Sequence, residues 1–152
     1  MPHIHYLHDF TVGAIIVYND KVLLINHPRY KKWLHPGGHI ELDEDPDTAV
    51  LREVEEETGL TVRVLGDKPN IQSDGVDIMH RPHFVDVHDA NPPHRHIGLF
   101  YVCIAQNDAV KISDEHEGYV WVSQEQLDDP KYNLSPSLKY YSLQAIKLAQ
   151  QQ

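Results

Sequence analysis

The sequence has little of what secreted, membrane-spanning or nucleic-acid-binding proteins need. Cys103 is the single cysteine among 152 residues, which excludes an internal disulfide and cysteine-rich metal sites. The longest mostly apolar run, "FTVGAIIVY", is far too short to cross a bilayer, and the first ten residues lack the basic and apolar regions of a secretory signal. A net charge of −10 lacks the basic footprint of nucleic-acid binding. We therefore expect a cytoplasmic protein with no nucleic-acid or membrane partner.

The length and the ordinary composition, 41% apolar and 24% charged, predict a single domain over residues 1–152. Apolar runs predict strands at residues 10–18, 21–26, 61–65, 83–87, 96–105 and 118–123. Start and stop signals predict helices at residues 45–58, 123–127 and from 135 onward. Residues 26–45 read as a loop, and the weak pattern over residues 66–94 is typical of a binding loop that includes one strand. The elements together predict a mixed α/β domain whose helices cover a sheet.

The stretch "REVEEETGL" places three glutamates, Glu53, Glu56 and Glu57, on one face of the predicted helix. A neighbouring face carries Val50, Leu51 and Val54 and should pack on the sheet. Like charges at this spacing cost about 0.2–0.5 kcal/mol per pair, and acids near a helix C-terminus oppose its dipole. The cluster is therefore either a solvated acidic face or a site for divalent cations, which would reverse both penalties.

Residues 38–60, "GHIELDEDPDTAVLREVEEETGL", resemble the Nudix box of the Nudix hydrolase (MutT-type) family. The defined positions are Gly38, Glu44, Arg52, Glu53, Glu56, Glu57 and Gly59, with apolar Val54 and Leu60. The preceding Pro36-Gly37 and the later "YVWVSQEQL" also look like the family. The resemblance implies the Nudix fold, an α/β/α sandwich with a central mixed sheet and a catalytic loop–helix–loop.

The resemblance also implies the site residues and the cofactor. Glu53, Glu56 and Glu57 would hold Mg²⁺, or Mn²⁺ as a substitute, with the Gly37 carbonyl as a further metal ligand and Glu44 in support. Arg52 would orient the carboxylates, and Gly38 and Gly59 would meet backbone demands at the two loops. Either Glu53 or a glutamate from the loop before the tryptophan-bearing strand would take a proton from water. In that loop, "SDEHEGYVW", we favour Glu115 over Glu117 because of its spacing to Trp121.

Substrate-binding candidates lie in three places. Arg29, Lys31 and Lys32 precede Trp33 and the Pro-Gly-Gly turn and can lie at a cleft mouth, although solvated loop charge is the alternative. Trp33, Tyr30 and Phe84 can stack on a base, with ordinary packing as the alternative. His39 and His96 are candidates to contact the substrate. The pairs "HPGGH" and "PPHRHIG" do not form a recognised zinc ligand set, so we expect no zinc site.

The implied activity is divalent-metal-dependent hydrolysis of a nucleoside diphosphate linked to another moiety. The alternative is a catalytically silent Nudix-type nucleotide-binding or regulatory module. Position 75 is a glycine where the family's ADP-ribose subgroup has a proline, and residues 61–100 lack the tyrosine of the dinucleoside-polyphosphate subgroup. A nucleoside triphosphate or related small nucleotide is therefore the expected substrate. Many family members dimerise, which leaves a homodimer open.

Overall fold

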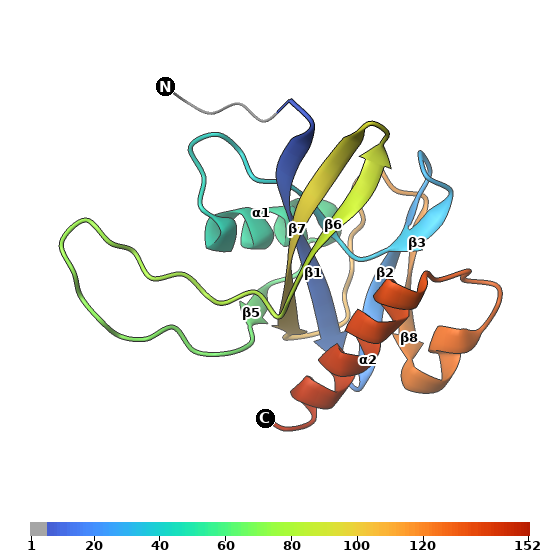
Figure 1. The fold of residues 1–152 in the computed structure, drawn as a ribbon. Coiled ribbons are helices and arrows are strands. Elements are labelled where there is room, and N and C mark those ends of the chain that lie inside the picture. Colours follow the sequence, from blue (N-terminus) through green and yellow to red (C-terminus); the bar gives the residue numbers. More distant parts are fainter. Residues whose placement is uncertain (1–5) are drawn as a thin grey trace.

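The computed structural model describes residues 6–152 and places them in one central sheet with helices on both of its faces (Figure 1). Residues 1–5 belong to the stretch in which we expect no secretory signal, and they lie outside the described residues. Within the described range, no helix is long and apolar enough to cross a membrane.

Most elements lie where the sequence predicts them. The strands are β1 (His8–Tyr18), β2 (Lys21–His27), β3 (Lys32–Leu34), β4 (Gly37–His39), β5 (Val62–Val64), β6 (Phe84–Asn91), β7 (His94–Ala105) and β8 (Gly118–Ser123). The helices are α1 (Pro46–Thr58), the 3₁₀ helix η1 (Gln124–Asp128) and α2 (Pro136–Ala149). The expectation of a continuous loop over residues 26–45 is wrong, because β3 and β4 lie within it. Both are three-residue strands held by main-chain pairing, which leaves no alternating side-chain pattern to recognise.

The described residues form one eight-stranded mixed sheet, with β3, β2, β1, β7 and β5 in spatial order. β1 and β7 run parallel over ten registered positions, from the His8–Arg95 pair to the Val17–Ile104 pair. β4 is antiparallel to the first half of β1, β8 to β2, and β6 to β7. The starts of β1 and β7 and the end of β4 therefore meet at one end of the sheet.

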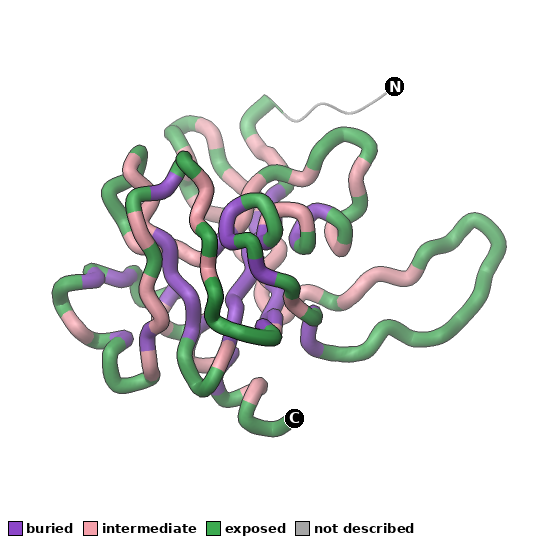
Figure 2. Tube along the Cα trace, turned by 180° about the vertical axis from the view of Figure 1, so that it is seen from behind, coloured by how far each residue is buried: buried purple, intermediate pink, exposed green. Residues whose placement is uncertain are grey.

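β1 is buried on both faces, which explains its continuous apolar run. Val12, Ala14 and Ile16 belong to the hydrophobic cluster on the α1 side, whereas Ile15 and Val17 belong to the cluster on the α2 side. Successive side chains of a strand point to opposite faces, so one strand serves both clusters. Figure 2 shows the buried residues concentrated in these central strands. The mixed sheet between two helical layers confirms the predicted α/β/α sandwich.

The boundaries of α1 follow from its end residues. The Asp45 side chain accepts a 2.8 Å hydrogen bond from the Thr48 N–H, and Pro46 begins the first turn. Gly59 adopts the left-handed conformation, with φ of 66°, and its N–H donates to the Glu55 carbonyl at 2.9 Å. The helix therefore begins and ends as the sequence predicts.

The buried stripe of α1 differs from the predicted face at one position. Val50 and Val54 are fully buried, as expected, but Leu51 is 44% exposed, so its assignment to the sheet face is wrong. The helix packs along positions 50, 54 and 57, a spacing that leaves Leu51 on the outer flank. The same stripe carries Glu57 into the interior, where it is 8% exposed.

Residues 66–83 form an irregular segment that projects from the body of the molecule (Figure 1). Asp47 of α1 anchors this segment: it accepts from the His80 N–H at 3.1 Å and lies 3.2 Å from Lys68 Nζ. One concave region lies inside this loop and is lined by Asp45 and residues 68–79. That region therefore does not coincide with the glutamates in the second half of α1.

Candidate active site

Arg52 links the acidic residues of the loop and helix into one cluster. Its Nε and Nη2 donate to the two carboxylate oxygens of Glu44 at 2.7 and 2.9 Å. Its Nη1 donates to Glu53 at 3.0 Å and to Glu56 at 3.1 Å. Nη2 also donates to the main-chain carbonyl of His39 at 3.1 Å, which ties the cluster to β4. One guanidinium thus fixes three carboxylates, because its planar fork can serve several acceptors at once.

The ionisable groups of this cluster differ in the direction of their pKa shifts. Hydrogen bonds from Arg52 hold the pKa of Glu44 below its usual value, and the bond to Glu44 raises the pKa of Arg52. Burial raises the pKa of Glu53, although Arg52 opposes the effect. Glu53 therefore carries a charge that the neighbouring protein groups alone stabilise poorly.

Gly38 makes room for one of these carboxylates. A Cβ placed on Gly38 would overlap the carboxylate group of Glu53. The absence of a side chain allows that group to lie against the backbone of β4. This packing explains why the strand carries glycine next to the acidic helix.

Glu57 is held by two partners that the sequence spacing does not reveal. One carboxylate oxygen accepts from the Gly37 N–H at 2.8 Å, and the other shares a 2.9 Å hydrogen bond with Nε2 of His116. Burial raises the pKa of Glu57 to about 8, with further contributions from the negative charges of Glu53 and Glu115. Burial also lowers the pKa of His116, whose side chain is completely enclosed. Burial therefore favours the uncharged form of both Glu57 and His116, which are joined by this hydrogen bond.

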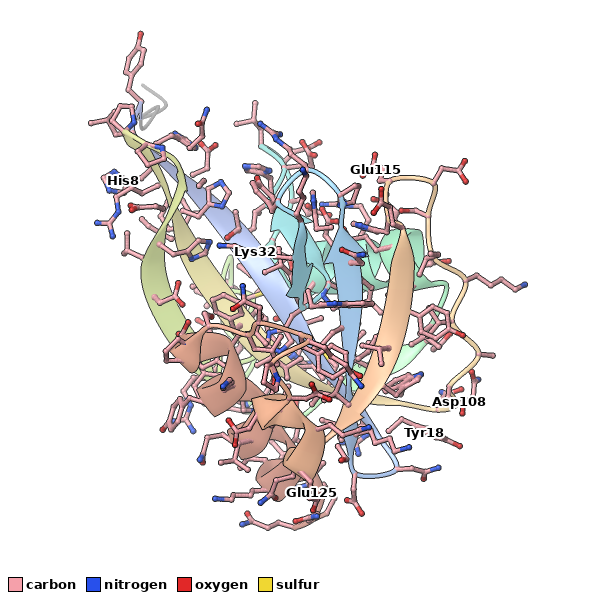
Figure 3. All side chains as sticks on the ribbon, turned by 90° about the vertical axis from the view of Figure 1, so that its right-hand side faces the viewer. His8, Tyr18, Lys32, Asp108, Glu115 and Glu125 are labelled. Atoms are coloured by element: carbon pink, nitrogen blue, oxygen red, sulfur yellow. The ribbon has the colours of Figure 1, made fainter. Side chains whose placement is uncertain are left out.

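Glu115 is a candidate from the sequence, whereas its neighbour His116 is not, although His116 is the residue that contacts Glu57. The one feature of the sequence that could have indicated His116 is its position next to Glu115 in the stretch "SDEHEGYVW". The loop before β8 reaches α1 because the Lys111 N–H donates to the Thr58 carbonyl at 2.8 Å and the Ser113 N–H donates to the Glu57 carbonyl at 3.2 Å. Glu115 itself is exposed in this loop (Figure 3), close enough for its charge to raise the pKa of Glu57.

The predicted substrate-binding residues at β3 lie in ordinary surroundings. Trp33 packs edge-on against Tyr132, with the ring centroids 5.9 Å apart, and lies against the cluster on the α2 side. Arg29 is exposed, with its guanidinium 5.7 Å from the Tyr30 ring centroid. Lys32 is exposed on β3 (Figure 3). A role of Arg29, Lys32 and Trp33 in substrate binding therefore stays a prediction.

His39 and His96 are brought together, with ring centroids 5.0 Å apart. Gly38 faces Glu53 on the α1 side, so the next residue, His39, points to the opposite face of the sheet. Burial lowers the pKa of His96 to about 4, and the positive charges of neighbouring histidines add to the effect. The two imidazoles therefore lie across β4 from the carboxylates.

The donor set on the α1 side fits a hard divalent cation. Glu44, Glu53, Glu56 and Glu57 offer carboxylate oxygens, which are the ligands that Mg²⁺ and Mn²⁺ prefer. Burial raises the pKa values of Glu53 and Glu57, the negative charges of neighbouring glutamates add to the effect, and a bound cation would oppose it. The carboxylate cluster is therefore a candidate metal centre.

Residues 7–143 match the NUDIX domain, and the chain belongs to the Nudix hydrolase family, as the resemblance of residues 38–60 predicted. The crystal structure of a NUDIX-family hydrolase from Clostridium perfringens is 31% identical, with a TM-score of 0.85 over 93% of this chain and 97% of that chain. The "MutT-like protein" of Streptomyces ambofaciens is 46% identical over 59 residues, 38% of each chain. The "Probable DHNTP pyrophosphohydrolase" of Lactococcus lactis subsp. cremoris is 39% identical over 58 residues, 38% of this chain. The alignments span 38% and 35% of these two curated relatives' own lengths.

Proposed function

We propose that this chain is a divalent-metal-dependent pyrophosphohydrolase that cleaves a phosphoric anhydride bond in a nucleoside diphosphate linked to another group. The observation that carries the proposal is the carboxylate cluster: Arg52 fixes Glu44, Glu53 and Glu56, and Glu57 is buried beside them. Bound Mg²⁺, or Mn²⁺ in its place, would polarise the phosphoryl oxygens and offset charge on the leaving group. An acidic protein needs such a cation to accept an anionic substrate.

Each residue of the cluster has a role in this proposal. Glu53, Glu56 and Glu57 hold the metal, and the Gly37 carbonyl is a further ligand. Arg52 keeps the carboxylates in place through its hydrogen bonds. Glu44 supports the centre through its two bonds to Arg52.

The proton of the attacking water would pass to Glu53 or Glu115. Burial raises the pKa of Glu53, which brings it toward the value of an effective base near neutral pH. Glu115 is exposed next to His116 and therefore has access to solvent. Parallel pH–rate profiles of Glu53→Gln and Glu115→Gln test the assignment, since removal of the base should abolish the acidic limb of the profile.

We favour a nucleoside triphosphate or related small nucleotide as the substrate. The name of one relative, a probable DHNTP pyrophosphohydrolase, supports a triphosphate. His39 and His96 would contact the part of the substrate beyond the diphosphate. Arg29 and Lys32 would attract its phosphates from the surface, and Trp33 would support β3 from the interior.

Product analysis by liquid chromatography tests the proposal. The purified protein with Mg²⁺ is given nucleoside triphosphates, oxidised nucleoside triphosphates, dihydroneopterin triphosphate, ADP-ribose, dinucleoside polyphosphates and sugar nucleotides. Cleavage of one compound at an anhydride bond, lost in Glu56→Gln and Glu57→Gln, is the expected result. Metal binding without turnover on any of these compounds would instead favour the catalytically silent nucleotide-binding module.

A further inference from the structure

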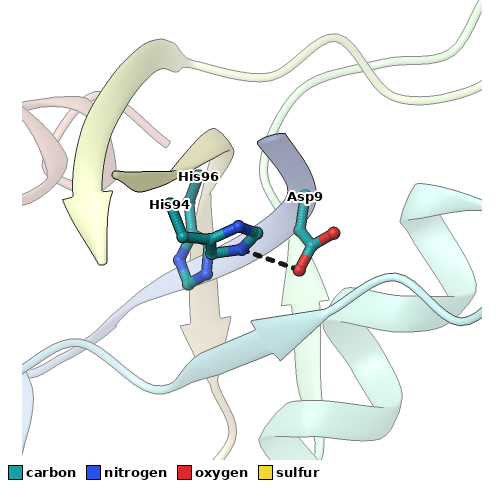
Figure 4. Close-up of side chains that lie close together, drawn as sticks. All are labelled: Asp9, His94 and His96. Atoms are coloured by element: carbon teal, nitrogen blue, oxygen red, sulfur yellow. Dashed lines mark hydrogen bonds and ion pairs between the residues drawn. The ribbon is translucent and has the colours of Figure 1, made fainter. Parts of the chain in front are cut away.

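A second group of potential metal ligands lies on the face of the sheet opposite α1. Asp9 Oδ2 lies 2.9 Å from Nε2 of His94 and 3.4 Å from Nε2 of His39. One ligand atom from each of Asp9, His94 and His96 lies within 4.8 Å of the other two (Figure 4). The three side chains are partly buried, so the position between them can be reached from solvent.

The strand register explains this convergence. Asp9 on β1 pairs in parallel register with His96 on β7, and His94 lies two residues earlier on the same face of β7. His39 joins them because its antiparallel partner on β1 is Thr11, two residues from Asp9. Asp9 is 85 positions from His94 in the chain, which is why histidine spacing alone did not indicate a ligand set.

The chemistry of this group differs from that of the glutamate cluster. Two imidazoles and one carboxylate form a donor set typical of Zn²⁺ and similar transition metals, whereas Mg²⁺ prefers oxygen alone. Three protein ligands leave a fourth position for water or another ligand. In a tetrahedral site with bonds of about 2.0–2.2 Å, the ligand atoms are roughly 3.5 Å apart, so small side-chain rotations suffice here.

Neighbouring groups hold part of this arrangement in place. Asp86 lies 2.7 Å from Nδ1 of His88 and accepts a 2.6 Å hydrogen bond from the Tyr141 hydroxyl. The His88 ring in turn lies edge-on to His96, with centroids 5.4 Å apart. His88 is thus hydrogen-bonded to Asp86 and packs against the ring of His96, and it is not one of the proposed ligands.

We propose that Asp9, His94 and His96 form a second metal site, selective for Zn²⁺ and similar transition-metal ions and separate from the glutamate centre. His39 lies beside the site, and its own main-chain carbonyl accepts from Arg52 of the glutamate centre. The two centres are therefore on opposite sides of β4. With an ion bound, His96 would reach a substrate through the remaining coordination position rather than directly.

Cobalt titration tests the site without using activity as the readout. Tag-free protein, with His3 and His5 replaced by Gln so that they do not bind metal, is titrated with Co²⁺ in excess Mg²⁺. The visible absorption reports coordination geometry, and Zn²⁺ displacement gives the affinity. We expect one Co²⁺ per chain with four-coordinate absorption bands, and the same result in Glu57→Gln.

Matched variants locate the bound ion. His94→Gln and Asp9→Asn should each weaken Co²⁺ binding by at least about tenfold, whereas His88→Gln should change it less than about threefold. Absence of Co²⁺ binding, or binding that is unchanged in His94→Gln and Asp9→Asn, would overturn the proposal. Failure of the hydrolase proposal would leave these results unaffected, because every variant here is judged by metal binding.

Discussion

Glu57 Oε1 lies 2.9 Å from Nε2 of His116, although the two residues are 59 positions apart in the chain. The imidazole comes from the loop before β8 and is completely enclosed. It fixes one oxygen of the carboxylate, while the Gly37 N–H fixes the other at 2.8 Å. The orientation of Glu57 is therefore set by two segments outside α1.

His116→Ala should lower the affinity for Mg²⁺ by about 10–100-fold, because an outer partner of a ligating carboxylate is lost. His116→Gln should retain more of that affinity, since its amide can still donate to Glu57. Isothermal titration calorimetry measures both values. His88→Gln, on the opposite face of the sheet, is the control, and an unchanged Mg²⁺ affinity in a folded His116→Ala protein would contradict the role assigned to His116.

Arg52→Lys should reduce kcat/KM at least about tenfold while the fold is kept. An ammonium group cannot form the two parallel bonds to Glu44 and also reach Glu53 and Glu56. Steady-state kinetics on the substrate found by product analysis gives the ratio, and circular dichroism checks the fold. Arg63→Lys, an exposed substitution on β5, should behave as the wild type. Equal activity of Arg52→Lys and wild type would show that the bidentate geometry is not needed.

Gly38→Ala and Gly118→Ala form a matched pair of glycine substitutions. The added methyl at position 38 would overlap the Glu53 carboxylate, whereas at position 118 nothing lies within 4 Å among the described residues. The obstacle at position 38 is the end of a flexible side chain, so the carboxylate should move and the backbone should not. We expect Gly38→Ala to lose metal affinity and activity with a change of less than about 1 kcal/mol in the free energy of unfolding. Urea denaturation and Mg²⁺ titration of both variants check this, and full activity in Gly38→Ala would be evidence against the close approach of Glu53 to β4.

The contribution of His35 to stability should depend on pH. His35 shares a 2.9 Å hydrogen bond with Ser142 of α2, and burial lowers its pKa to about 3. Below pH 6.5 the unfolded chain binds a proton at this residue that the folded chain does not bind, so stability falls as the pH drops from 6.5 toward 3. At pH 5 the loss from this residue amounts to at most about 2 kcal/mol.

His35→Gln cannot titrate, so its stability should decrease less than that of the wild type between pH 7.5 and pH 5. Urea denaturation at the two pH values gives the difference. The other histidines with lowered pKa values are present in both proteins, and their effects cancel in the comparison. Parallel stability changes in the two proteins would show that His35 is not kept neutral by the fold.

The elements that the sequence predicts well are those with a local signal. α1 is marked by Asp45, Pro46 and Gly59, and the long strands β1 and β7 are marked by apolar runs buried on both faces. β3 and β4 have no such signal, because their strand character comes from pairing with residues of β2 and β1. Long-range strand pairing, and not the local sequence pattern, therefore determines that these two segments are strands.

The same distinction applies to the candidate site. The glutamates of α1 and Arg52 lie within one short motif, so the sequence could bring them together. His116 contacts Glu57, 59 positions away in the chain, and Asp9 contacts His94, 85 positions away. The first contact depends on how the loop before β8 packs on α1 and the second on the register of β1 and β7, and neither can be read from local sequence. Trp33 has the residue type of a base-stacking side chain, but its packing against Tyr132 follows from the position of the segment before α2.

The central claim is that the carboxylates of α1 form a divalent-metal centre, and titration with Mn²⁺ followed by electron paramagnetic resonance tests it most directly. Free Mn²⁺ gives a strong signal that decreases when the ion is bound, so the affinity is read without any substrate. We predict that the wild type binds Mn²⁺ in competition with Mg²⁺, that Glu56→Gln and Glu57→Gln bind it at least about tenfold more weakly, and that His94→Gln binds it as the wild type does. Equal Mn²⁺ binding by the wild type and both glutamate variants would contradict the claim.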